Sequence, residues 1–544
     1  MKIIEGNIID IHKRKIFKGR LEINDNKIIN IKEKVTDSNC YILPGFIDSH
    51  MHIESTMLIP SEFAKLAVSN GTVAVIADPH EIANVMGCKG VDFMIENAKK
   101  VPLKTYFAIP SCVPVSKNEF SGAEINSTDI DNLFQKHNLH ILGEVMDYEG
   151  ILKNEKQIFD KIETAKKYNA LIDGHAPGLT LEENYKYAES GISTDHECSN
   201  IEEAINKLNA RMKIQIREGS AAQNFEALYP LLEKYNEEIM LCTDDSHPDD
   251  LLEKGHINKI IAKGLKMGVN LFDLLQATTL NPQKHYRLDV GMLKPGDNAD
   301  FVIIDNLENF NVLETYINGK AVYSNGRVLF DSKKEKAINN FKIKEIDIED
   351  IQIKKEANYI NVIEVIDKEL LTNSFTTRAK TDKNNNLISD IDKDILKIVV
   401  VNRYKKQKAT IGFINGIGLR KGAIATSISH DSHNIIAVGT DDLSILNAIN
   451  EIISKKGGIT YVNEKNYYTI ELEFAGLMTQ DSAENVANKY KELNNIVKAN
   501  GIKLTSPFMT LSFMSLLVIP KLKISAKGLF DVEKMKFINL FSEK

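Results

Sequence analysis

The order of apolar and polar positions changes along the chain. Residues 1–43 alternate apolar and polar side chains around a turn at Asn24–Lys27, which predicts small antiparallel strands. From Pro60 to about Tyr286, apolar runs such as Thr72–Ala77 alternate with amphipathic segments such as Glu155–Tyr168. Alternating strands and helices predict an α/β fold with a parallel sheet, and over this length they favour a (β/α)8 TIM-type barrel over a doubly wound sheet.

Strand-like segments return after this central region. The stretch Gly291–Ile304 is followed by Asn-Gly pairs at Asn318–Gly319 and Asn325–Gly326, which predict short hairpins. We expect these strands to pair with the amino-terminal ones. Together they predict a small discontinuous β-sandwich made of residues 1–43 and 288–330.

The remaining boundaries follow from changes in composition. Residues 44–287 form the predicted barrel, and a charged, lysine-rich stretch from Asp331 to about Lys355 leads into a further domain. We expect that C-terminal domain, residues 340–544, to be mixed α/β. Its most apolar stretch, Phe513–Pro520, is too short to span a membrane and predicts a buried strand.

Composition narrows the class of protein. A chain of 544 residues is too long for one compact domain, and its net charge of −7 gives no electrostatic case for binding nucleic acid or an anionic membrane. The five cysteines form no CxxC pair, so a disulfide framework or a cysteine zinc site is not indicated. We find no signal-peptide core and no membrane span, and we expect a cytoplasmic protein that acts on a small molecule.

The first chemical signal is a pair of histidines at the end of an apolar run. The segment Pro44–His52 reads PGFIDSHMH, which places His50 and His52 two positions apart. On a β-strand this spacing points both imidazoles to the same face. The two side chains can therefore hold one metal ion.

Four more candidate metal ligands end short apolar or β-branched runs. A barrel of parallel strands collects its catalytic groups at the carboxyl ends of the strands, so these residues are expected to meet His50 and His52. They are Glu144, His175, His196 and Asp244.

Longer motifs extend the pattern and resemble a known family. They are Pro44–Met57, Ala77–Val85, Gly143–Met146, Asp173–Leu179, Ile216–Ala221, Cys242–Leu251, Ser429–Val438 and Ser506–Phe513. With these motifs the chain resembles the amidohydrolase superfamily and, within it, the adenine deaminase family, over essentially its whole length. The resemblance implies a two-metal barrel enzyme that hydrolyses adenine to hypoxanthine and ammonia in purine salvage or adenine catabolism, usually with manganese or iron.

The ligand types suggest how two ions would be held. His50 and His52 would bind one ion, His175 and His196 the other, and Glu144 would bridge them. Many relatives use a carbamylated lysine as the bridge, whereas a carboxylate offers two oxygens without carbon dioxide. Histidine and carboxylate ligands suit manganese, iron(II) or zinc, so the metal is left open. The alternative for Glu144 is an ion pair with a lysine.

Two residues are candidates for proton transfer. Asp244 would bind metal, take the proton from the attacking water and deliver it to the departing ammonia. The alternative is that Asp245 has this role while Asp244 caps a helix. Glu81 resembles the family's second acid/base residue and would place a proton on ring N1, unless His80 and Glu81 only brace their loop.

Other polar residues are candidates for substrate binding. Arg217 and Glu218 are expected either to bind substrate or to form a structural ion pair. His430 and His433 belong to an HDSH cluster that could close over the barrel mouth or bind further metal. We expect five remaining histidines to be ordinary surface residues: His12, His137, His140, His256 and His285.

Two rival functions remain. One is hydrolysis of a cyclic amide, as in dihydroorotase- or hydantoinase-like enzymes; those relatives usually carry the bridging lysine and lack the domain with the HDSH cluster. The other is a non-catalytic scaffold, which would be expected to have lost ligands. We therefore favour adenine deamination, and we expect a homo-oligomer, specifically a dimer.

Overall fold

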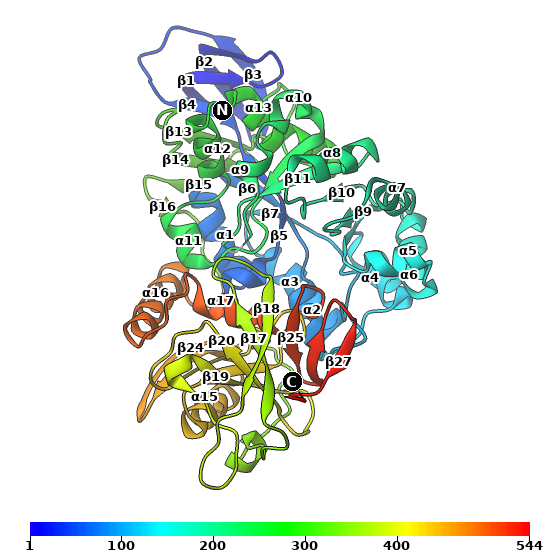
Figure 1. The fold of residues 1–544 in the computed structure, drawn as a ribbon. Coiled ribbons are helices and arrows are strands. Elements are labelled where there is room, and N and C mark those ends of the chain that lie inside the picture. The colour runs from blue at the N-terminus through cyan, green and yellow to red at the C-terminus, as the bar shows by residue number, and fades with distance from the viewer. Residues whose placement is uncertain (221, 544) are drawn as a thin grey trace. The chain divides into compact units, whose positions relative to one another are not determined.

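The computed structural model describes residues 1–220 and 222–543 (Figure 1). Ala221, which ends the motif Ile216–Ala221, and Lys544, which ends the predicted C-terminal domain, lie outside the described residues. The chain divides into two compact units. The first unit consists of Met1–His80, Asp92–Ser111 and Asn126–Lys334, and the second of Glu81–Val91, Cys112–Ile125 and Glu335–Lys544.

The two ends of the first unit's chain join in one eight-stranded sheet. Its hydrogen-bonded order is β16-β15-β14-β13-β4-β1-β2-β3, with β13 antiparallel to β4 and β4 parallel to β1. The bounds are β1 (Lys2–Asp10), β2 (Lys15–Asn24), β3 (Lys27–Glu33), β4 (Tyr41–Pro44), β13 (Phe301–Ile304), β14 (Val312–Ile317), β15 (Lys320–Ser324) and β16 (Arg327–Val328). The alternating apolar positions form a core that includes Ile8, Leu21, Ile23 and Phe301.

The Asn-Gly pairs form the turns of the predicted hairpins. Asn318 and Gly319 have φ values of 49° and 73° between β14 and β15. Asn325 and Gly326 have φ values of 50° and 77° between β15 and β16. Two consecutive residues with positive φ make the turn whose twist matches that of antiparallel strands, and asparagine and glycine adopt this conformation most readily.

Eight parallel strands of the first unit follow one another in chain order. They are β5 (Phe46–Met51), β6 (Thr72–Ala77), β7 (Lys104–Phe107), β8 (Ile141–Val145), β9 (Leu171–Gly174), β10 (Thr194–Asp195), β11 (Lys213–Arg217) and β12 (Ile239–Cys242). Ladders join β5-β6-β7, β8-β9 and β10-β11-β12. A parallel bridge between Ile109 and Leu142 links the first two groups, and another between Met51 and Asp244 brings the end of β12 beside β5.

Helices separate most of these strands, so the protein is α/β with several sheets. Capping boxes at Asn126 and Thr180 fix the starts of α4 and α7. Helix α2 (His80–Met86) lies in the second unit apart from its first residue, and α3 (Cys88–Ala98) is divided between the units. The other helices of the first unit are α1 (Pro60–Ser69), α4 (Ser127–His137), α5 (Tyr148–Lys153), α6 (Lys156–Lys167), α7 (Leu181–Glu189), α8 (Ile201–Asn209), α9 (Phe225–Leu228), α10 (Leu231–Lys234), α11 (Pro248–Glu253), α12 (Ile257–Lys266), α13 (Leu271–Leu275) and α14 (Asn281–His285).

A buried carboxylate ties β5 to the end of β12. Asp48 accepts hydrogen bonds from the Thr243 amide at 3.1 Å and from its hydroxyl at 2.5 Å. His256 Nε2 lies 3.0 Å from the second carboxylate oxygen of Asp48. The prediction that His256 is a surface residue is therefore wrong, because only 1% of its side chain is exposed. A polar neighbourhood in sequence did not reveal this long-range partner.

The second unit is built on a nine-stranded sheet. Its order is β18-β17-β20-β19-β22-β21-β23-β24, and β28 also pairs with β17. The bounds are β17 (Tyr359–Val365), β18 (Thr372–Arg378), β19 (Ile395–Val401), β20 (Thr410–Asn415), β21 (Ala423–Thr426), β22 (Ile435–Gly439), β23 (Gly458–Asn463), β24 (Asn466–Glu471) and β28 (Phe541–Ser542). A three-stranded sheet adds β25 (Leu522–Ser525), β26 (Gly528–Asp531) and β27 (Lys536–Ile538).

Helices cover part of the second unit's sheet. Helix α15 (Asp442–Lys455) packs on β21, β22 and β23 through Ile445, Ala448, Ile449 and Ile452, whose helical spacing puts them on one face. The other helices are α16 (Ala483–Ala499) and α17 (Pro507–Ser512). The predicted strand at Phe513–Pro520 is wrong, because α17 continues into a 3-10 turn at Phe513–Ser515. A short apolar run fits a buried helix as well as a strand, and Pro507 favours a helix start.

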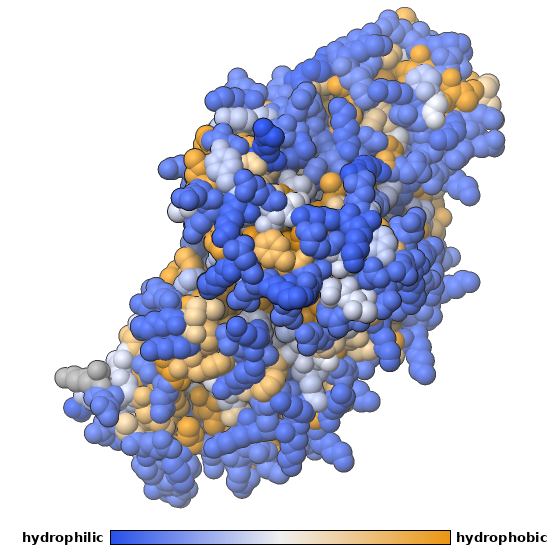
Figure 2. Space-filling model, turned by 90° about the vertical axis from the view of Figure 1, so that its right-hand side faces the viewer, coloured by the Kyte–Doolittle hydropathy of each residue, from blue (hydrophilic) through white to orange (hydrophobic). Residues whose placement is uncertain are grey.

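Hydrophilic side chains predominate on the face drawn in Figure 2, with hydrophobic ones interspersed among them. Within residues 1–220 and 222–543, none of the helices has the length and apolar character that crossing a membrane requires.

A buried ion pair allows a test of the first unit's stability. Lys207 Nζ in α8 lies 2.5 Å from Asp195 Oδ1 in β10, and both side chains are 0% exposed. Replacing Lys207 with methionine leaves a buried carboxylate without its cation, so we expect a loss of about 3–5 kcal/mol in unfolding free energy. Chemical denaturation followed by circular dichroism measures it.

The matched control is Lys153→Met, which removes a surface ion pair with Glu149. The Lys153 side chain is 62% exposed and that of Glu149 is 44% exposed. That variant should lose less than about 1 kcal/mol. Equal losses in the two variants would show that the buried pair does not stabilise the unit.

Candidate metal centre

The structure brings the six predicted metal-binding residues together at the carboxyl ends of the first unit's parallel strands. His50 lies in β5 and Glu144 in β8, while His52, His175, His196 and Asp244 follow β5, β9, β10 and β12 within two residues. Because parallel strands end at the same edge, side chains far apart in sequence become neighbours. Five of the six are buried, and the His175 side chain is 21% exposed.

Glu144 lies at the centre of this group. One of its carboxylate oxygens, Oε2, is 2.7 Å from His175 Nδ1 and 3.2 Å from His196 Nε2. The other, Oε1, is 3.3 Å from His52 Nε2. The two oxygens therefore face two different sets of imidazoles. Within the described part of the chain, the ion-pair partners of Glu144 are histidines and not the lysine that the sequence left as an alternative.

Asp244 faces His50 and His52 from the end of β12. Its Oδ1 lies 3.3 Å from His52 Nε2 and 3.8 Å from His50 Nε2. The Asp244 backbone has a φ of 54° and its amide donates to the His50 carbonyl oxygen at 3.0 Å. A left-handed conformation in a residue other than glycine is costly, and such conformations are typical of functional sites.

The residues fit divalent metal ions. Three groups of ligand-type atoms lie within 4.8 Å of one another: His50 with His52 and Glu144; Glu144 with His175 and His196; and His50 with His196 and Asp244. Within the described residues, the buried His50 Nε2 has no hydrogen-bond partner. A buried imidazole nitrogen without a partner is costly unless it binds a ligand. Imidazole nitrogens and carboxylate oxygens are also the ligands that manganese, iron(II) and zinc accept.

Electrostatics keep the carboxylates ionised. Burial opposes the charge of Glu144, but the charge of His175 and the hydrogen bonds from three histidines hold its pKa well below the ordinary value. Burial likewise opposes the charge of Asp244, and Arg217 together with His52 holds that pKa well below the ordinary value. Burial, reinforced by His196, lowers the pKa of His50 well below its usual range. A neutral imidazole is the form that binds metal.

Arg217 and Glu218, the two predicted substrate-binding residues of the first unit, have protein partners. Arg217 is buried and forms ion pairs with Glu197 and with Asp244 Oδ2, the latter at 2.6 Å. Glu218 Oε2 lies 2.9 Å from Lys263 Nζ. Arg217 is thus in contact with the candidate centre, whereas Glu218 forms the structural ion pair that the sequence left open.

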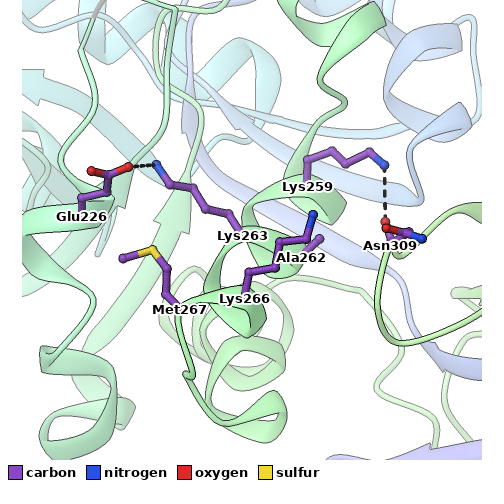
Figure 3. A pocket seen from close by; sticks show the side chains of 7 residues that line it. All are labelled: Glu226, Lys259, Ala262, Lys263, Lys266, Met267 and Asn309. Atoms are coloured by element: carbon purple, nitrogen blue, oxygen red, sulfur yellow. Dashed lines mark hydrogen bonds and ion pairs between the residues drawn. The ribbon is translucent and has the colours of Figure 1, made fainter.

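A surface cavity near Lys263 is separate from this centre. Its volume is about 420 Å³, and Figure 3 shows the seven residues that line it. They are Glu226, Lys259, Ala262, Lys263, Lys266, Met267 and Asn309, and the predicted site residues are not among them. The Lys263 side chain points toward Glu226, with which it forms an ion pair at 3.1 Å.

Sequence reasoning missed Asp78 and His80 as candidate ligands, and it named Asp245 only as the alternative to Asp244. Asp78 and His80 form a further ligand-type group with Glu144, and Asp245 forms one with His52 and Asp244. His80 Nδ1 lies 3.4 Å from Glu144 Oε1, and Asp78 Oδ2 accepts the Glu144 amide at 3.0 Å. Asp78 directly follows β6 and His80 lies three residues after its end, so the rule that found the six residues would have found them too. Asp245 accepts a hydrogen bond from Ser55.

Glu81, His430 and His433 meet in the second unit. Glu81 Oε1 lies 2.5 Å from His430 Nδ1, and Glu81 Oε2 is hydrogen-bonded to His433 Nε2. All three residues are buried. The sequence predicted Glu81 as an acid/base residue and both histidines as substrate-binding residues, but it did not predict their mutual contact.

Comparison with known proteins gives two family matches within the chain. The model described as the amidohydrolase family matches residues 41–322, and the model described as the adenine deaminase C-terminal domain matches residues 369–536. The first match covers the parallel strands and their candidate centre, and the second includes His430 and His433. Members of the amidohydrolase family bind divalent metals, in agreement with the ligand-type groups.

Curated relatives match from end to end. An adenine deaminase of Methanosarcina mazei is 49% identical, and the match covers 100% of this chain and 100% of the relative. An adenine deaminase of Borreliella burgdorferi is 46% identical, over 98% of this chain and 99% of the relative. An adenine deaminase of Parabacteroides distasonis is 44% identical, and the match covers 99% of this chain and 98% of the relative. The chain therefore belongs to the amidohydrolase family and, within it, to the adenine deaminases.

Proposed function

We propose that this protein is an adenine deaminase, which converts adenine and water to hypoxanthine and ammonia. The observation that carries the proposal is the end-to-end match, at 49% identity, to a relative of that name. The ligand-type groups that share Glu144 support it, since this chemistry needs an activated water. A cyclic-amide hydrolase is disfavoured by the second unit, which matches the adenine deaminase C-terminal domain.

In this proposal the parallel strands of the first unit form a (β/α)8 barrel. Ladders and bridges join β5 through β9, and β10 through β12 and back to β5. The Ser193 amide, directly before β10, donates to the Ile172 carbonyl oxygen of β9 at 2.9 Å, and together these links support this architecture. Residues 44–287 then form the barrel, residues 1–43 and 288–330 the discontinuous β-sandwich, and residues 340–544 the C-terminal domain. The protein acts as a homodimer.

Two divalent ions would complete the centre, with manganese or iron(II) as the preferred metal and zinc as the alternative. His50 and His52 would hold one ion, His175 and His196 would hold the other, and Glu144 would serve both, as the opposite orientation of its two oxygens supports. A bound divalent ion lowers the pKa of water from about 15.7 to about 7 and so supplies a nucleophile at neutral pH.

Asp244 transfers the proton. Its Oδ2 is engaged by Arg217, while Oδ1 faces His52 and His50, so Oδ1 is the atom that accepts the proton from the attacking water. The same atom returns that proton to the departing ammonia. Glu81 places a proton on ring N1, as the resemblance of its motif predicts. It directly follows His80, a neighbour of Glu144, in the chain.

The metal assignment predicts two divalent ions per chain after reconstitution. Glu144→Ala removes the shared ligand and should reduce the metal content below one ion per chain, because the ligands of both ions then lack a carboxylate oxygen. The control His137→Ala, at a histidine that pairs with Asp92, should retain two. Elemental analysis of the gel-filtered protein measures the content. Less than one ion in fully reconstituted wild type would refute the site.

The substrate assignment predicts that free adenine is deaminated and adenosine is not. The full-length relatives are named for the base, and no feature of the sequence indicates a sugar site. The loss of adenine absorbance and the release of ammonia measure turnover. Faster turnover of adenosine than of adenine with saturating metal would overturn the assignment, and ring opening of dihydroorotate would favour the cyclic-amide alternative.

Arg217→Met should shift the pH dependence of the reaction. Arg217 lowers the pKa of Asp244, so its loss raises that pKa and reduces the fraction of ionised Asp244 at a given pH. The acid limb of kcat/KM should therefore move to higher pH, and the rate near neutrality should fall at least about tenfold, or about 1.4 kcal/mol.

The control for this variant is Arg287→Met, at an exposed arginine that donates to the Asn169 carbonyl oxygen. It should keep the wild-type pH profile. An unchanged acid limb in Arg217→Met would contradict the role of Arg217 in holding Asp244 ionised.

A further inference from the structure

Both oxygens of the Glu81 carboxylate are held by imidazoles from one short loop, residues 429–434. His430 reaches Oε1 through Nδ1 at 2.5 Å, and His433 reaches Oε2 through Nε2. Glu81 is 2% exposed, His430 6% and His433 1%. A buried carboxylate with two imidazole partners is fixed in both position and rotation.

The hydrogen bonds of His433 define its tautomer. The Ser429 amide lies 3.4 Å from His433 Nδ1, and an amide N–H can only donate, so Nδ1 carries no proton. The neutral ring then carries its hydrogen on Nε2, which points at Glu81. Burial is the main cause that lowers the pKa of His433 to about 4; Glu81 opposes it, and His430 and Arg403 add to it. His433 is therefore a neutral donor near pH 7.

His430 is oriented by a different contact. Its ring stacks on Phe513, with centroids 4.5 Å apart and planes inclined by 14°. This packing sets the plane of the imidazole and directs Nδ1 toward Glu81. The two histidines thus use different ring nitrogens for the same task.

The loop itself is tied to the rest of the second unit. The Tyr404 hydroxyl donates to the Ser432 carbonyl oxygen at 2.7 Å. Asn434 accepts from the Arg403 amide at 3.3 Å and donates to the Phe120 carbonyl oxygen at 2.9 Å. Because these bonds order the loop in the folded protein, the donors to Glu81 are preorganised.

We propose that His430 and His433 are positioning residues that act on the reaction through Glu81, as hydrogen-bond donors, and that they bind neither the substrate nor a metal. This inference rests on the proposed function, in which Glu81 protonates the ring. A positioning residue and a substrate-binding residue differ in their effects on kcat and KM. Loss of a donor should lower kcat, because Glu81 is misplaced, and leave KM nearly unchanged.

The two donor atoms allow a test with side-chain amides. The amide nitrogen of asparagine replaces Nδ1 of histidine, and that of glutamine replaces Nε2. We expect His430→Leu and His433→Leu to lower kcat for adenine at least about tenfold, with KM changed less than about threefold. His430→Asn and His433→Gln should recover most of this loss, whereas the exchanged amides, His430→Gln and His433→Asn, should recover less.

A double-mutant cycle tests whether the effect passes through Glu81. In a Glu81→Gln protein, adding His430→Leu or His433→Leu should lower kcat by less than about twofold, because coupled residues are not additive. His12→Leu, at an exposed histidine, is the matched control and should keep wild-type kcat. Circular dichroism and elemental analysis accompany each variant. If a leucine variant does not fold, the comparison of matched with exchanged amides tests the proposal.

The outcomes separate the possible roles. A rise in KM with unchanged kcat would overturn the proposal in favour of substrate binding. Loss of metal in the leucine and amide variants alike would overturn it in favour of a metal site. Full activity of both leucine variants, equal recovery by all four amides, or additive losses in the cycle would overturn it as well. Wild-type protein that releases no ammonia from adenine would instead refute the proposed function.

Discussion

The buried carboxylate of Glu144 is the constraint on which the first unit's centre depends. A carboxylate without water is stable only when cations or donors surround it. Here the surrounding groups are His52, His175 and His196, each from a different strand end. The strands must therefore end at one level, and a shift of any of them would remove a partner of Glu144.

Other buried polar contacts hold the strands at that level. Asp48 joins β5 to the residues after β12 through Thr243, and Lys207 secures Asp195 immediately before His196. Buried pairs of this kind contribute little net stability compared with apolar packing, but breaking one is costly. Their effect is to fix geometry, and the residues they fix are the neighbours of the candidate ligands.

The second unit also contains a buried carboxylate with imidazole partners. Glu81 is held by His430 and His433, which lie 349 and 352 residues further along the chain. The difference lies in the partners. Around Glu144 several imidazoles converge with further carboxylates, as metal ligands do, whereas around Glu81 each oxygen has its own imidazole donor. The arrangement around Glu144 is suited to binding metal ions, whereas the arrangement around Glu81 is suited to orienting its carboxylate.

The sequence by itself determined the alternation of strands and helices, the Asn-Gly hairpins, the family and six candidate ligands that the structure brings together. It could do so because strand ends are local features and a polar residue after an apolar run is visible without a structure. Tertiary structure decided the rest: the burial of His256 against Asp48, the pairing of Glu218 with Lys263, the helical form of Phe513–Ser515 and the partners of Glu81. The ion pairs and hydrogen bonds among these join residues distant in sequence, which packing selects and periodicity does not encode. The helical form of Phe513–Ser515 was missed because a short apolar run fits either a helix or a strand.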